Sequence, residues 1–153
     1  MWSSRTSKLA SKILSSLLVS CLALCCLGFA ACGGGEVKDG TYTGQSSNFE
    51  GDAVDGAGYG VATITIKDGV ITECTFETFE LDGNKKDENY GVSLSGNKNK
   101  YTKAQNAVNA CPEYAKALVE AGSLDGVDTI SGATVNYDQF REAVEDALAQ
   151  ARA

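Results

Sequence analysis

Residues 59–81 constrain the fold most, because they have the pattern of two strands joined by a tight turn. Between positions 62 and 66 every second residue is apolar, which is the period of a strand with one buried face. Asp68-Gly69 follows, and this dipeptide favours a two-residue hairpin turn because glycine adopts positive φ without strain. The segment therefore predicts a β-hairpin.

The second strand of this hairpin has an irregular alternation. Ile71 would lie on the apolar face of the first strand, whereas Cys74 and Phe76 fall out of phase with it. Two explanations stay open: the strand is buried on both faces, or a bulge near Thr72-Glu73 resets the alternation. Residues 40–44 have the composition of a further short strand, and residues 45–60 are expected to form a loop.

Helices are predicted in the second half of the chain. Residues 82–100 carry seven charges and four Asn, which indicates a long, mobile, solvated loop. An alanine-rich helix follows at 104–110, and Pro112 suits the first turn of a new helix that ends at Gly122.

The last helix has the clearest pattern. Asn136-x-x-Gln139 resembles a capping box at its start. Five apolar residues form one stripe along it: Phe140, Val144, Ala147, Leu148 and Ala151. Together these elements predict a small α+β domain, a hairpin-based antiparallel sheet with packed helices.

The start of the chain has the pattern of an export signal. Residues 2–12 are polar and basic, residues 13–31 are apolar, and Phe29-Ala30-Ala31-Cys32 precedes three glycines. This arrangement resembles a bacterial lipobox, in which the cysteine takes lipid and becomes the mature N-terminus; a retained transmembrane helix is the alternative. We expect a signal peptide at 1–31, lipidated Cys32 and a flexible tether at 32–38, and a domain at 39–153 on the extracytoplasmic face of a bacterial cell membrane.

Composition excludes several functions. The 153 residues include no His, and the Met and Trp are at positions 1 and 2, so catalytic triads and His-ligated metals are excluded. Without the leader, 122 residues carry 10 basic and 20 acidic groups, a net charge of −10 that argues against a nucleic-acid partner. If Cys32 is lipidated, Cys74 and Cys111 form a disulfide or stay free, and both alternatives are open.

A loop of small residues lies before the last helix, with the sequence Asp128-Thr129-Ile130-Ser131-Gly132-Ala133-Thr134. Unpaired N–H groups at a helix start attract an anion, and a glycine allows close approach, so the loop suits a phosphate. Ordinary helix capping is the simpler explanation of the same residues.

The pattern Asp-x-x-Ser-Gly-Ala-Thr resembles the flavinylation motif of the FMN-binding domain family, whose members include components of the sodium-translocating NADH:quinone reductase and of the Rnf complex, and small extracytoplasmic flavoproteins. Residues 39–44, Gly58-Tyr59-Gly60 and Lys67-Asp68-Gly69 occur in the family's order. The resemblance implies that a flavin transferase splits FAD and esterifies FMN through its phosphate to Thr134. Ser131, Gly132 and Ala133 would hold that phosphate, and the transferase would need Asp128.

The resemblance also implies a redox carrier rather than an enzyme with its own substrate. The FMN would accept electrons from a membrane donor and pass them to an extracytoplasmic acceptor or reductase. A lipoprotein that binds FMN or another ligand reversibly, without redox work, is the alternative. Tyr59, Phe76 and Tyr90 are candidates by residue type for contact with the flavin ring. Gly56-x-Gly58-x-Gly60 precedes a hairpin and not a helix, so it does not predict a dinucleotide loop.

Overall fold

The structure, a computed structural model, describes residues 36–51, 56–94 and 96–153. The expected signal peptide, Cys32 and most of the tether lie outside the described residues. The tether's last residues pack on the domain, because the Lys38 amide donates to the Ala151 carbonyl (2.9 Å) and Val37 contacts the core. Within the described ranges, no helix combines the length and hydrophobicity needed to cross a membrane.

Three antiparallel strands form the sheet, in the order β1 (Gly40–Gln45), β2 (Tyr59–Lys67) and β3 (Val70–Phe79). The predicted hairpin joins β2 to β3, and its turn has positive φ at both Asp68 (53°) and Gly69 (74°). Both values match the tight turn that twisted strands favour, so the hairpin prediction is confirmed.

The irregular alternation of β3 comes from a bulge. Thr65 pairs with Glu73 and Ile66 pairs with Ile71, which leaves Thr72 as an extra residue on β3. Thr72 and Glu73 are both exposed, and Phe76 is buried again. The bulge was one of the two explanations left open, and the structure confirms it.

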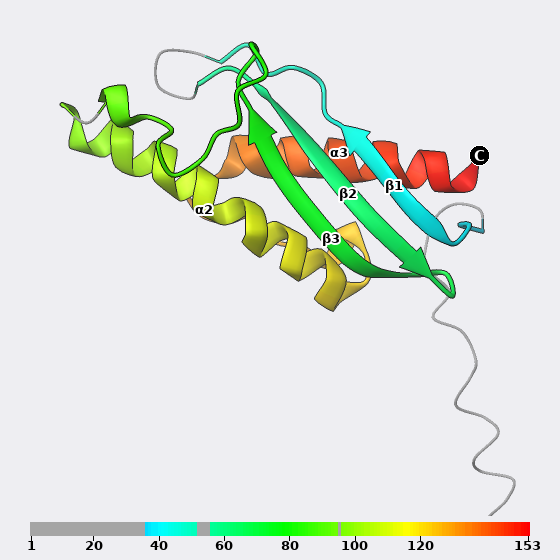
Figure 1. The fold of residues 1–153 in the computed structure, drawn as a ribbon. Coiled ribbons are helices and arrows are strands. Elements are labelled where there is room, and N and C mark those ends of the chain that lie inside the picture. The colour runs from blue at the N-terminus through cyan, green and yellow to red at the C-terminus, as the bar shows by residue number, and fades with distance from the viewer. Residues whose placement is uncertain (1–35, 52–55, 95) are drawn as a thin grey trace, which may run out of the picture. The chain divides into compact units, whose positions relative to one another are not determined.

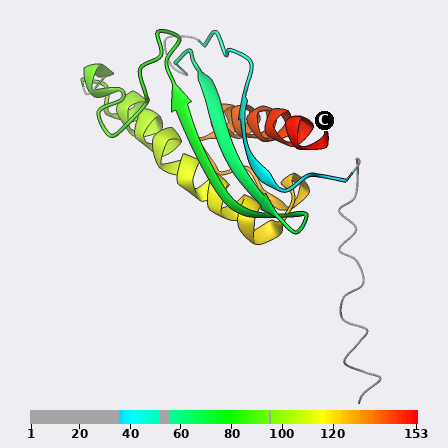
Figure 2. The same cartoon turned by 45° about the vertical axis from the view of Figure 1, so that its right-hand side comes forward.

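Both helices pack on one face of the sheet, α3 (Thr134–Arg152) across β1 and β2 and α2 (Lys98–Ala121) along β3 (Figure 1). The turned view shows the same layers (Figure 2). The core lies between these layers, where Ile64 of β2 and Phe140 of α3 are fully buried. The predicted stripe on α3 is confirmed, with Leu148 partly buried and the other four residues fully buried. The α+β prediction is confirmed.

The prediction of a helix start at Pro112 is wrong. α2 begins at Lys98, inside the segment expected to be a loop, and continues through Pro112 to Ala121. Asn97 caps its start and Gly122, with φ 71°, ends it as predicted. A proline inside a helix removes one backbone donor, and here tertiary packing outweighs this local signal because Cys111 and Tyr114 on either side are buried in the core.

The capping box is wrong as well. α3 begins at Thr134, and neither predicted capping residue caps it, because both are buried. The Asn136 side chain donates to the Ala107 carbonyl of α2 (3.0 Å), and Gln139 donates to the Gly58 carbonyl (3.0 Å). Both amides therefore join α3 to its neighbours instead of closing its end.

Candidate functional site

The loop before α3 is fixed by one buried tyrosine of α2. Tyr114 is fully buried, and its hydroxyl accepts a hydrogen bond from the Ile130 amide (3.0 Å) and donates one to the Ala133 carbonyl (3.1 Å). The Tyr137 hydroxyl donates to the Val127 carbonyl (2.9 Å) at the other end of the loop. Side chains from two helices therefore hold the backbone of the predicted motif.

The end of the motif leaves the start of α3 open. Thr134 is exposed and is the first residue of the helix, and Ala133 at the N-cap has no side chain that could satisfy the first amides. Gly132 has φ 82° and no neighbouring atom within 4 Å of where a Cβ would lie. Free amides, a helix dipole and open space together suit a phosphate group.

A cavity of about 320 Å³ lies beside this helix start. Gly132, Ala133 and Thr134 line it, together with residues of α2, of the segment after β3 and of the loop before β2. Asp128 and Ser131 are exposed and lie outside the lining, so the structure brings together only three of the five predicted cofactor residues.

The charged side chains that line the cavity are all basic. Among the described residues, its lining includes Lys86 and Lys103 and contains no Asp or Glu. Sequence analysis missed both lysines, because they lie in segments that are far from the motif along the chain. In the sequence, Lys86 is one of the seven charges of residues 82–100, the segment predicted to be a solvated loop.

Lys86 is buried, with 9% of its surface exposed, so its assignment to a solvated loop is wrong. Its ammonium donates to the Gly56 carbonyl (3.3 Å) and lies 5.0 Å from the centre of the Tyr90 ring. Burial lowers the pKa of Lys86 below its ordinary value of 10.5, and the charge of Glu80 opposes this shift. The buried side chain is held because its backbone amide donates to the Thr78 carbonyl (2.9 Å) at the end of β3.

Of the three aromatic candidates, only Tyr90 lines the cavity. Phe76 packs edge-on against Phe140 in the core, with ring centres 5.2 Å apart, and Tyr59 stacks on Phe79 at 5.5 Å. Tyr90 is partly buried, and burial raises the pKa of its hydroxyl.

The glycines before β2 make room for these cavity side chains. A Cβ on Gly58 would collide with the Phe79 backbone carbonyl oxygen and lie 2.7 Å from the Lys86 ammonium, and one on Gly56 would collide with the Tyr90 hydroxyl. The Gly-x-Gly pattern therefore serves close packing in this fold.

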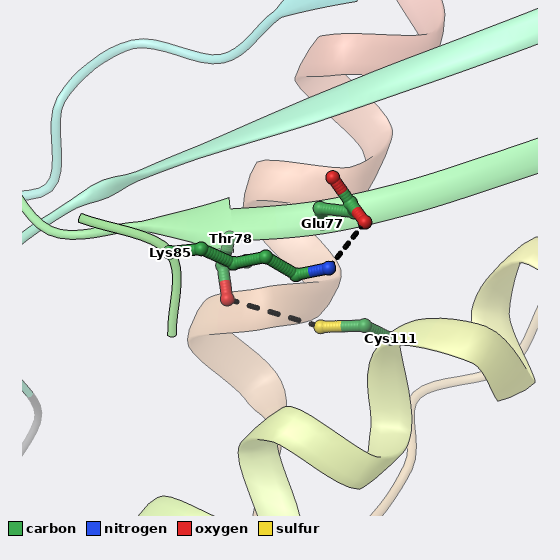
Figure 3. Close-up of polar contacts among 4 residues, drawn as sticks. All are labelled: Glu77, Thr78, Lys85 and Cys111. Atoms are coloured by element: carbon green, nitrogen blue, oxygen red, sulfur yellow. Dashed lines mark hydrogen bonds and ion pairs between the residues drawn. The ribbon is translucent and has the colours of Figure 1, made fainter. Parts of the chain in front are cut away.

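Both described cysteines are free, which settles the open question of a disulfide. Cys111 contacts two residues that line the cavity: its sulfur accepts from the Asn136 side-chain amide (3.4 Å) and lies 3.9 Å from the Thr78 hydroxyl (Figure 3). Figure 3 also shows Lys85 turned toward the Glu77 carboxylate, with which it forms an ion pair. Burial raises the pKa of Cys111, and raises that of Cys74 to about 12, so both thiols stay protonated and weakly nucleophilic at neutral pH.

A second, larger hollow of about 880 Å³ runs between β3 and α2. Its walls include Phe76, Cys111 and Val119, and it shares Thr78, Lys86 and Val108 with the smaller cavity. Lys86 therefore lies where the two hollows meet.

This geometry defines a small α+β domain with an uncapped helix start beside a cavity whose described lining includes two lysines and no carboxylate. Residues 6–149 match the model of the FMN-binding domain, and the chain belongs to the FMN-binding domain family. The family resemblance seen in the sequence is thereby confirmed, and flavin binding follows from it.

Two solved structures are similar to this chain. One is the crystal structure of a Clostridium perfringens protein, 29% identical with a TM-score of 0.55, and the match covers 75% of this chain and 88% of that one. The other is a solution structure of a Clostridium thermocellum protein, 21% identical with a TM-score of 0.35, covering 72% of this chain and 92% of that one. No curated protein matches significantly.

Proposed function

We propose that the protein is a lipid-anchored extracytoplasmic electron carrier whose FMN is esterified through its phosphate to Thr134. The observation that carries the proposal is the position of this hydroxyl: Thr134 is exposed, opens α3 and lines a cavity with two lysines and no carboxylate among its described residues. Family membership supplies the cofactor class, and the residues present fit it.

Attachment needs an accessible hydroxyl. The Thr134 oxygen would attack the FMN phosphorus of FAD in the active site of a flavin transferase, which breaks the pyrophosphate, releases AMP and frees the hydroxyl proton. The small neighbours Gly132 and Ala133 leave space for the incoming pyrophosphate. Asp128 is exposed at the other end of the loop, where the transferase could contact it.

The phosphodiester would lie at the uncapped start of α3. It carries about one negative charge, less than the 1.5 to 2 of a free phosphate monoester, so an acidic protein holds it at lower electrostatic cost. Gly132 lets the backbone approach it, and Ala133 leaves the first helix amides available. When bound, the FMN supplies the redox chemistry, and the chain supplies its position and its surroundings.

The membrane part of the proposal rests on the sequence pattern around Cys32. Lipid on Cys32 would hold the domain on the outer side of a bacterial membrane, next to a membrane electron donor and an extracytoplasmic acceptor or reductase. A covalent bond would also prevent loss of the cofactor outside the cell.

Mass spectrometry of the native protein tests the proposal. The full chain is made together with a flavin transferase, either as wild type or with Thr134→Val or Thr129→Val. Thr129 is the matched control, because it is an exposed threonine of the same loop. We expect the FMN mass on the tryptic peptide that contains Thr134 in wild type and Thr129→Val, and no added mass in Thr134→Val.

Acid precipitation distinguishes the alternative function. Covalent flavin stays with the precipitated protein, whereas reversibly bound FMN stays in the supernatant. Wild-type protein without the added mass, made with an active transferase, would refute covalent attachment. Yellow colour that is lost on precipitation would then favour the reversible FMN-binding lipoprotein.

A further inference from the structure

Among the buried residues that the structure describes, Lys86 is the only charged one. A buried ammonium normally pairs with a carboxylate, because an unpaired charge in a protein interior costs several kcal/mol. No carboxylate of the described residues lies within ion-pair distance of Lys86, and its polar contacts are a carbonyl and the face of a ring. The charge of Glu80 acts on the ammonium without direct contact, so an anionic ligand beside Lys86 would offset the cost of its burial.

The surroundings of Lys86 also point to a ligand. Its side chain forms part of the wall of both hollows, and the smaller hollow has Thr134 in another part of its wall. The aromatic ring of Tyr90 lies against the ammonium. A ligand fixed at Thr134 therefore has Lys86 in the wall of whichever of the two hollows it enters.

We infer that the Lys86 ammonium contacts the pyrimidine end of the flavin ring and favours the reduced form of the cofactor. This inference rests on the proposed function, because it assumes FMN at Thr134. Reduction places negative charge on that end of the ring, and a cation there stabilises the reduced form more than the neutral oxidised form. In a partly buried setting this interaction is weakly screened by solvent.

The phosphate is the other anionic group that Lys86 could contact. The open amides and the dipole of α3 already serve the phosphate at the Thr134 end, and Lys86 comes from the segment after β3. Contact of Lys86 with the flavin ring and contact with the phosphate predict different effects when Lys86 is replaced. A lysine at the phosphate affects how much FMN is attached, whereas a lysine at the ring affects the midpoint potential.

The test compares flavinylated full-length wild type with Lys86→Met and Lys67→Met. Lys67 is the matched control, because it is an exposed lysine at the end of β2 and lines neither hollow. Flavin per protein and the midpoint potential are measured by mass spectrometry and reductive titration. We expect Lys86→Met to stay flavinylated and to lose at least tenfold in its preference for the reduced form, which is a fall of about 30 mV for two electrons. Lys67→Met keeps the wild-type potential.

A flavinylated Lys86→Met protein with the wild-type potential would overturn the inference, as would a loss of attached flavin without a change of potential. If Lys86→Met does not fold by circular dichroism, Lys86→Gln and Lys86→Arg replace it. Lys86→Arg is then expected to keep a potential near wild type, and Lys86→Gln to lower it. Wild-type protein that carries no covalent FMN would instead refute the proposed function.

In that case, titrations of the same variants with free FMN in both redox states would test the role of Lys86 by itself. The affinity for reduced FMN should fall by a larger factor in Lys86→Met than the affinity for oxidised FMN. Equal losses of the two affinities would overturn the inference.

Discussion

Tyr114→Phe tests whether one buried hydroxyl holds the motif loop in place. The substitution removes a single oxygen and keeps the ring, which packs on Phe140 with ring centres 5.5 Å apart. The Ile130 amide then loses its hydrogen-bond acceptor. The Ala133 carbonyl keeps a partner, because it also accepts from the Tyr137 amide at 3.0 Å.

The expected loss therefore comes from one backbone donor. A buried N–H group left without a partner costs about 1–3 kcal/mol, and Ile130 is only partly buried, so we expect a loss of about 1–2 kcal/mol. At about 1.4 kcal/mol the ratio of unfolded to folded protein rises tenfold. The released loop is also expected to slow the attachment of FMN to Thr134, because the hydroxyl no longer has one fixed position.

Urea unfolding of the protein without flavin measures the first effect, as a lower midpoint at unchanged slope. The initial rate of flavinylation by the transferase measures the second. Tyr42→Phe is the control: it removes a hydroxyl that donates to the Lys38 carbonyl (3.0 Å) at an exposed site on β1, and it should leave the flavinylation rate unchanged. If Tyr114→Phe lowers the midpoint no more than Tyr42→Phe, the hydroxyl does not hold the loop.

Two further predictions concern packing and pH. Gly58→Ala should destabilise the fold by about 2–4 kcal/mol in urea, because φ is 153° and the new Cβ would collide with the Phe79 backbone carbonyl oxygen as well as lie 2.7 Å from the Lys86 ammonium. Gly96→Ala, with open space around it, should change stability by less than about 0.5 kcal/mol, and equal effects of the two would contradict the packing role. Hydrogen bonds from the Ser47 hydroxyl, the larger effect, and from the Ser47 amide lower the pKa of Glu142 below its ordinary value of 4.5. The ionised carboxylate therefore stabilises the fold above pH 4.5, and this stabilisation is lost as the pH falls through the lowered pKa. The urea unfolding midpoint should therefore fall less from pH 7 to about pH 3 in Glu142→Gln than in wild type. An equal fall in the two proteins would refute a stabilising role of the Glu142 carboxylate.

Local patterns predicted the parts of the fold that depend on neighbours in the sequence. The Asp68-Gly69 turn has few alternatives at positive φ, and the alternation of β2 is a direct consequence of one buried face. The same rules failed at Asn136 and Gln139. Their spacing fits a capping box, but both amides are used in contacts with residues far along the chain, namely Ala107 and Gly58. A pattern within four residues cannot distinguish these two uses of an amide.

The candidate site also combines residues that could be predicted from local sequence with residues that only the tertiary structure brings there. The motif loop is contiguous in sequence, so Gly132, Ala133 and Thr134 could be predicted as neighbours of one site. Lys86 could not, because its burial depends on the close approach of the segment after β3 to the loop before β2. In sequence it is one of seven charges in a polar stretch, and only the fold separates it from Lys85, which points to solvent and Glu77.

The charge of the whole chain and the charge of the cavity lead to different conclusions about ligands. The net charge of −7 acts on a partner that covers a large surface, such as a nucleic acid, which needs many phosphate contacts. A single phosphodiester interacts mainly with the groups around it, because exposed charges beyond about 8 Å are largely screened at physiological salt. Among the described residues, the charged side chains that line the cavity are Lys86 and Lys103, and Glu80 acts on Lys86 from outside the lining. An acidic protein can therefore hold one anionic cofactor, provided that its acidic side chains face the solvent and the buried charge is positive.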